Sequence, residues 1–189
     1  MMSTTITNHN RFHPLKFALW LGIASMIMLF AALTSAYIIR KAQGNWVDFR
    51  MPAIFWFDTV VIIISSITMQ WTVRAFRRFQ VNACKIALTI TLLLGIIFLI
   101  GQYRGWSAME EMGIYINGNP SGSFVYVISG VHAAHIVGGL VIMLSLLLKM
   151  VTSTFNPNRL VRVELMSTYW HFVDVLWIYL FIFFQINIF

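Results

Sequence analysis

Charged residues are scarce in this sequence, and their scarcity excludes a soluble fold. The chain has 189 residues, of which 10% are charged and 59% are apolar. A soluble domain carries roughly 25% charged residues, so this chain has too few to cover a surface that faces water. A mean hydropathy of +0.79 leads to the same conclusion. The composition predicts one integral membrane domain, residues 1–189.

The sequence has a single cysteine, and neither an internal repeat nor the pattern of a signal peptide is recognisable in it. The single cysteine, Cys84, excludes an internal disulfide and a CxxC site. The first ten residues are polar and lack the basic region and the cleavage site of a signal peptide. We therefore expect the first apolar run to stay in the mature protein. No internal repeat or second domain is visible.

Five apolar segments are long enough to cross a bilayer, which requires about 20 residues in a helix. The fold class predicted is all-α, with five transmembrane helices in one bundle. The third segment is short, and the loop that follows it (105–123) has room for a small surface helix around Met109–Met112. The predicted spans are Phe17–Ile39, Ala53–Val73, Ile86–Tyr103, Phe124–Leu148 and Leu165–Phe189.

The thirteen lysines and arginines lie at the ends of these spans, so the net charge of +7 does not indicate nucleic-acid binding. Basic residues are enriched on the cytoplasmic side of membrane proteins. Nine of them fall on one side and four on the other, which predicts a cytoplasmic N-terminus and an external C-terminus. The nine are Arg11, Lys16, Arg74, Arg77, Arg78, Lys85, Lys149, Arg159 and Arg162, and the four are Arg40, Lys41, Arg50 and Arg104.

Two histidines stand inside the fourth span. His132 and His135 are three residues apart and therefore share one helical face. Ser129 and Gly139 extend that face with small side chains, which allow another helix to approach closely. Ionisable groups in a bilayer are costly unless they are paired, so this face is predicted to pack against a neighbouring helix.

The fifth span and the residue just before it carry three ionisable residues on one helical face: Glu164, His171 and Asp174. His135 and Asp174 lie at similar depth near the middle of the bilayer, on adjacent antiparallel spans. We predict that spans four and five pack together, with these two side chains facing each other in a hydrogen bond.

Three chemical uses of these residues compete with structural pairing. A metal site would take His132, His135 and His171, and a haem would take one of the histidines as an axial ligand. A proton path would use the acids Asp58, Glu164 and Asp174, although Asp58 lies close to the outer end of its span. We favour structural pairing, with no metal site and no cofactor bound by this chain.

Two tryptophans lie one heptad apart inside the fifth span. Trp170 and Trp177 are interpreted as packing or lipid-contacting residues, and Asp58 as an interface residue.

Two motifs resemble one membrane protein family. The string from Tyr169 to Trp177, YWHFVDVLW, with Glu164 upstream, is similar to the closing helix of subunit III of the haem-copper respiratory oxidases. The string from Gly130 to Gly139, GVHAAHIVGG, resembles the preceding helix of that family. Five spans match the short bacterial form.

The resemblance is fainter in spans two and three. Asp58-Thr59 and the later Trp71 look like the start and end of a family helix. The next helix commonly reads Gln-x-x-Glu in the family, whereas this chain has Gln102 followed by Gly105. The chain therefore departs from the family at that acid.

The resemblance implies an accessory role. Family members contain neither haem nor copper, which belong to partner subunits, and they contact subunit I chiefly, with subunit II in the same complex. They also hold phospholipids and support cytochrome c or quinol oxidation by oxygen, with proton translocation, in the bacterial cytoplasmic membrane. On this basis we expect a non-catalytic subunit with an interhelical polar network of His132, His135, Glu164, His171 and Asp174.

Two other functions are possible. A haem-bearing membrane anchor of a dehydrogenase would use the histidines as axial ligands. A small transporter often shows repeats or broken helices, and the five spans contain no internal proline.

Overall fold

The computed structural model describes residues 14–152 and 160–187. The polar segment 1–10, two of the thirteen basic residues (Arg11 and Arg159) and the last two residues of the fifth predicted span lie outside the described residues.

Five long helices make up the fold, and within the described ranges there is no strand. Each helix is long and apolar enough to cross a membrane. The predicted all-α membrane fold with five spans is therefore confirmed. The helices are α1 (Pro14–Ala42), α2 (Ile54–Arg77), α3 (Val81–Glu111), α4 (Pro120–Thr152) and α5 (Leu160–Asn187).

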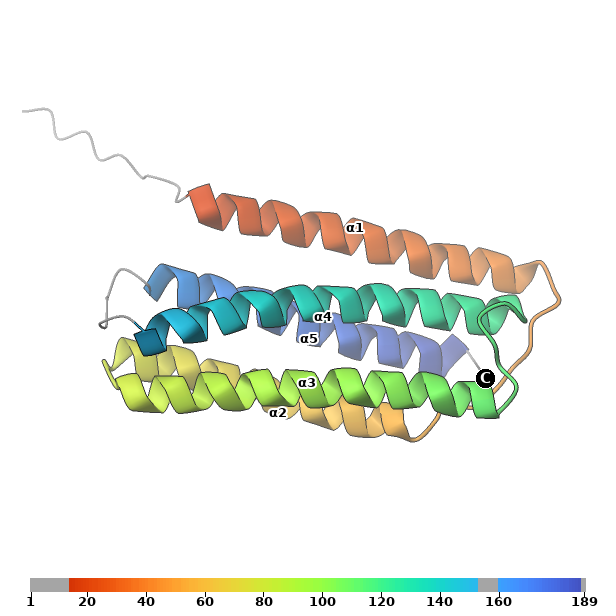
Figure 1. The fold of residues 1–189 in the computed structure, drawn as a ribbon. Coiled ribbons are helices and arrows are strands. Elements are labelled where there is room, and N and C mark those ends of the chain that lie inside the picture. Colours follow the sequence, from red (N-terminus) through yellow and green to blue (C-terminus); the bar gives the residue numbers. More distant parts are fainter. Residues whose placement is uncertain (1–13, 153–159, 188–189) are drawn as a thin grey trace, which may run out of the picture.

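Helices α2, α3, α4 and α5 form a four-helix ring, and α1 lies outside it (Figure 1). Around the ring α2 packs on α3, α3 on α4, α4 on α5, and α5 back on α2. Helix α1 packs on α4 and α5. The starts of α1, α3 and α5 therefore share one end of the bundle with the ends of α2 and α4. We call this the basic end, because it holds Lys16, Arg74, Arg77, Arg78, Lys85, Lys149 and Arg162 among the described residues.

Helix α3 runs farther than the sequence predicted. It continues unbroken to Glu111, so the prediction of a separate surface helix around Met109–Met112 is wrong. Met109 is fully buried, and the ring of Phe55 from α2 packs against Gly105. A Cβ at Gly105 would lie 2.7 Å from the Phe55 ring. Glycine therefore lets α2 approach α3 here, and a glutamate at the same position would displace Phe55.

Trp170 of α5 fills the centre of the ring. Its indole nitrogen donates to Ser65 Oγ of α2 at 2.9 Å. The indole ring of Trp170 lies against Gly95 of α3 and Gly139 of α4, where an added Cβ would come within 3.0 Å of indole carbons. One side chain thus contacts all three other helices of the ring, and the predicted close approach at Gly139 is present.

Among the residues that the structure describes, helix α1 is held by one apolar stripe and two polar contacts. Its buried residues recur every three or four positions, as on one helical face. Thr34 shares a hydrogen bond of 3.2 Å with the Tyr179 hydroxyl of α5. Lys41 donates to the carbonyl oxygen of Asn187 at the end of α5. Both polar contacts lie in the second half of α1, far from the basic end.

Candidate functional site

The buried polar side chains are distributed over the interior of the ring, in separate groups. The first group joins α2 to α3. Gln102 Nε2 donates to Asp58 Oδ2 at 2.9 Å, and both residues are fully buried. The interpretation of Asp58 as an interface residue is therefore wrong, because Gly101 leaves room for its carboxyl group between the two helices.

The second group is centred on the buried side chain of His132 of α4, which is surrounded by aromatic rings. Its ring is fully buried and lies 5.2–6.3 Å, between centroids, from the rings of Trp177, Phe98 and Phe30. Neither ring nitrogen has a hydrogen-bond partner among the described residues. His132 is therefore packed as an aromatic ring, in contact with helices α1, α3 and α5.

His135 lies one turn farther along α4, and it also contacts Phe30, at 5.7 Å between centroids. Its Nδ1 atom is 2.8 Å from the Val131 carbonyl oxygen of the same helix. The link to α5 runs through the backbone, since the Tyr169 hydroxyl donates to the His135 carbonyl oxygen at 2.9 Å. The predicted hydrogen bond between His135 and Asp174 is absent.

His135 and Asp174 do not meet because of the way α5 is rotated about its axis. Its ionisable face packs against α2, not against the histidines of α4. Arg77 of α2 forms a salt bridge of 2.8 Å with Glu164. His171 Nδ1 lies 2.6 Å from Ser66 Oγ, and Nε2 lies 3.3 Å from Gln70 Oε1.

Asp174 follows His171 by one turn and is only 2% exposed. Within the described parts of the chain, neither carboxyl oxygen has a hydrogen bond of normal geometry. Asp174 lies on the face of α5 that meets α2, one helical turn beyond the contact between His171 and Ser66. The five residues predicted as one network are thus divided into a histidine pair on α4 and a row on α5 that faces α2.

Both tryptophans of α5 are buried as packing residues. Trp170 and Trp177 are fully inaccessible, so the alternative of lipid contact is wrong for both. Trp177 donates to Thr59 Oγ1 of α2 at 3.2 Å and packs edge-on against Phe98. Hydroxyls of α2 satisfy both indole N–H groups, which would be costly to bury alone.

Within the described ranges, no group of three or more His, Cys, Asp or Glu residues is arranged to hold a metal ion. His132 and His135 on α4 are separated from His171, which faces α2. The three histidines considered as one ligand set therefore do not come together.

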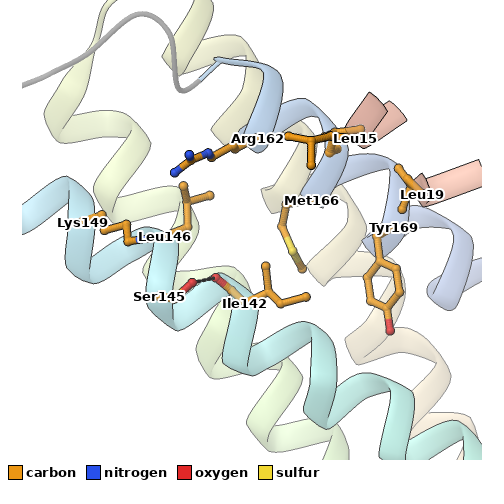
Figure 2. A pocket seen from close by; sticks show the side chains of 10 residues that line it. Leu15, Leu19, Ile142, Ser145, Leu146, Lys149, Arg162, Met166 and Tyr169 are labelled. Atoms are coloured by element: carbon orange, nitrogen blue, oxygen red, sulfur yellow. Dashed lines mark hydrogen bonds between the residues drawn. The ribbon is translucent and has the colours of Figure 1, made fainter. Parts of the chain in front are cut away.

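A groove opens between α1, α4 and α5 near the basic end (Figure 2). Its volume is about 380 Å³. Figure 2 shows Lys149 from α4 and Arg162 from α5 at one end of the groove, and Leu15 and Leu19 from α1 along its side. The other lining residues are Ile142, Ser145, Leu146, Leu165, Met166 and Tyr169.

The sequence did not identify several residues that build these groups. Ser66, Gln70 and Arg77 contact the ionisable face of α5, and Gly101 accommodates Asp58. The available signal was the run of polar residues in span two, which recur about every four positions on one face.

The comparison with known proteins gives a consistent family. The family model described as "Cytochrome c oxidase subunit III" matches residues 3–187. A cytochrome c oxidase subunit 3 from Corynebacterium diphtheriae is 34% identical over 168 residues, covering 85% of this chain and 82% of that protein. A protein of the same name from Bacillus sp. strain PS3 is 26% identical over 95% of this chain and 86% of its own. A cytochrome bo(3) ubiquinol oxidase subunit 3 from Buchnera aphidicola is 25% identical, covering 99% of this chain and 94% of that protein.

Proposed function

Since the chain belongs to the cytochrome c oxidase subunit III family, we propose that it is the accessory subunit III of a haem-copper terminal oxidase. The observation that carries the proposal is the family match over residues 3–187, together with five helices long enough to span a membrane. Relatives are named for cytochrome c and for ubiquinol oxidases. The complex would therefore oxidise one of these two classes of donor with oxygen.

The interior of the bundle supports a role without a redox centre of its own. A haem ligand needs an open coordination face on its histidine, whereas aromatic rings from three helices surround His132. The haem and copper centres would lie in subunits I and II, with subunit I as the main contact. These packing contacts favour the oxidase subunit over the haem-bearing membrane anchor.

The charges and the relatives support a location in the bacterial cytoplasmic membrane. The relatives named above are bacterial, which supports the bacterial cytoplasmic membrane. The basic end would face the cytoplasm, so that α1 begins inside and α5 ends outside. At this end the side chain of Glu164 is 28% exposed and that of its partner Arg77 is 62% exposed. This position is suited to contact with water or lipid headgroups.

The groove of Figure 2 is suited to a phospholipid. Its sides are apolar along α1, α4 and α5, as an acyl chain requires. Lys149 and Arg162 stand at the end where headgroups of the cytoplasmic leaflet would lie, and cations at that depth attract phosphate. A bound lipid would fill the space between α1 and the ring and so stabilise the attachment of α1.

We expect the double variant Lys149→Gln/Arg162→Gln to lose about one anionic phospholipid per complex, because the phosphate loses both cations of the groove. Native mass spectrometry of the purified complex measures the bound lipid. The matched control is Arg104→Gln, an exposed arginine of α3 at the opposite end of the bundle. Equal lipid content in the double variant and the wild type would contradict the assignment.

The accessory role is tested by purification in mild detergent through a tag on this chain. The tag belongs at the N-terminus, because Lys41 contacts the carbonyl oxygen of Asn187 near the other end. We expect a much larger polytopic subunit to co-purify, together with haem and copper. Recovery of the chain alone would count against the proposal.

A further inference from the structure

A polar cleft lies between α2 and α5 at the basic end, on the side of the ring away from the lipid groove. Its volume is about 300 Å³. The salt bridge between Arg77 and Glu164 stands on its wall, and His171 and Gln70 also line it. At a rise of about 1.5 Å per residue, His171 lies about 10 Å farther along α5 than Glu164. The cleft therefore extends from the headgroup region into the membrane.

The hydrogen bonds of His171 determine which of its ring nitrogens carries hydrogen. Nε2 faces Gln70 Oε1, and an amide oxygen only accepts, so Nε2 carries the hydrogen. In the neutral ring Nδ1 is then an acceptor, and at 2.6 Å it accepts from the Ser66 hydroxyl. Ser66 has thereby used its hydrogen, and its oxygen is left to accept from another donor.

Asp174 is the group placed to be that donor. It is buried one helical turn beyond His171, on the helix face that contacts Ser66, and among the described residues no cation or N–H group contacts its oxygens. An ionised carboxylate in this position would be uncompensated within the bilayer. The protonated acid instead supplies an O–H that the Ser66 oxygen can accept when the two side chains rotate toward each other.

We propose that Asp174, Ser66 and His171 form a proton-exchange site that opens to the basic end through this cleft. In one concerted step the Asp174 O–H proton moves to Ser66 Oγ, and the Ser66 proton moves to His171 Nδ1. A neutral pair of acid and imidazole thus becomes a carboxylate and an imidazolium, with Ser66 restored and net charge unchanged. His171 then releases the Nδ1 or Nε2 proton to water in the cleft, and a proton from water returns by the reverse route.

The chain offers an internal control for this site. Asp58 is also a fully buried acid, and its partner is Gln102. Neither acid lines the polar cleft itself, but the Asp174 site reaches it through His171, whereas Asp58 lies near the opposite end of α2 and its partner Gln102 does not line the cleft. Two buried carboxyl groups in one protein should therefore differ in how fast their protons exchange with solvent.

The test uses infrared spectroscopy of the whole oxidase complex transferred into D2O. The C=O band of each protonated acid is assigned by its loss in Asp174→Asn and in Asp58→Asn. We expect the Asp174 band to be present and to shift on deuteration well before the Asp58 band. Ser66→Ala should slow the Asp174 shift by about tenfold, since the route loses one hydrogen bond, and Ser66→Thr, which keeps the hydroxyl, should restore it.

Three results would overturn the proposal: no Asp174 band in the wild type, equal exchange rates for Asp174 and Asp58, or exchange in Ser66→Ala as fast as in the wild type. Haem content and subunit composition of each variant complex show separately whether assembly is intact. A failure of the exchange site is thereby distinguished from a failure of the accessory role.

Discussion

Replacing Trp170 with alanine is expected to lower the free energy of unfolding of this chain by about 3–5 kcal/mol, the cost typical of emptying a site filled by a buried aromatic ring. Its indole lies between Gly95 and Gly139 and donates to Ser65. The variant would leave a cavity where four helices meet. Helix association within a membrane depends on such packing, because lipid is as apolar as the side chains. Chemical unfolding of the purified chain in detergent micelles measures the change.

The matched control is Trp20→Ala. Trp20 is 62% exposed on α1, and its replacement should change stability by no more than about 0.5 kcal/mol. Equal effects of the two tryptophan variants would show that the four helices α2 to α5 are not packed around Trp170.

Gly101→Ala is expected to destabilise the chain by about 1–3 kcal/mol, as overpacked cores do. The added methyl group would overlap the Asp58 carboxyl group, which is enclosed between α2 and α3. Adding Asp58→Ala should remove the overlap. The double variant would then lose less stability than the sum of the two single variants, with a coupling energy of at least about 1 kcal/mol. Unfolding measurements on all four proteins give the coupling.

Gly138→Ala controls for the general effect of replacing a glycine in a helix. A Cβ at Gly138 would meet nothing within 4 Å, so this variant should be neutral or up to about 1 kcal/mol more stable, through helix propensity alone. Additive losses in the Gly101 and Asp58 variants would mean that the two residues are not in contact.

The five helices were predictable because hydropathy decides which segments enter a bilayer. Their ends were less predictable. Hydropathy predicts that the third span ends at Tyr103 and that residues 105–123 form a loop, yet α3 continues to Glu111. A helix can extend beyond the hydrocarbon core as long as its buried side finds a partner, and here Met109 does.

The site was predicted in part. The shared face of Glu164, His171 and Asp174 followed from helical spacing, and the structure places Glu164 and His171 in contact with α2. Which neighbour that face meets could not be read from spacing, since it depends on the rotation of α5. Trp170 and Tyr169 set this rotation by packing against Gly139 of α4, and the acids consequently face Ser66 and its neighbours.

The accessory role is tested most directly by the location of the haem. The tagged complex is purified, this chain is then dissociated with stronger detergent, and visible spectra and copper content are measured on both fractions. Our proposal predicts haem and copper in the remaining complex and no haem absorbance in the fraction that contains this chain. A stoichiometric haem band in that fraction would contradict it, and would make His132 or His135 a ligand.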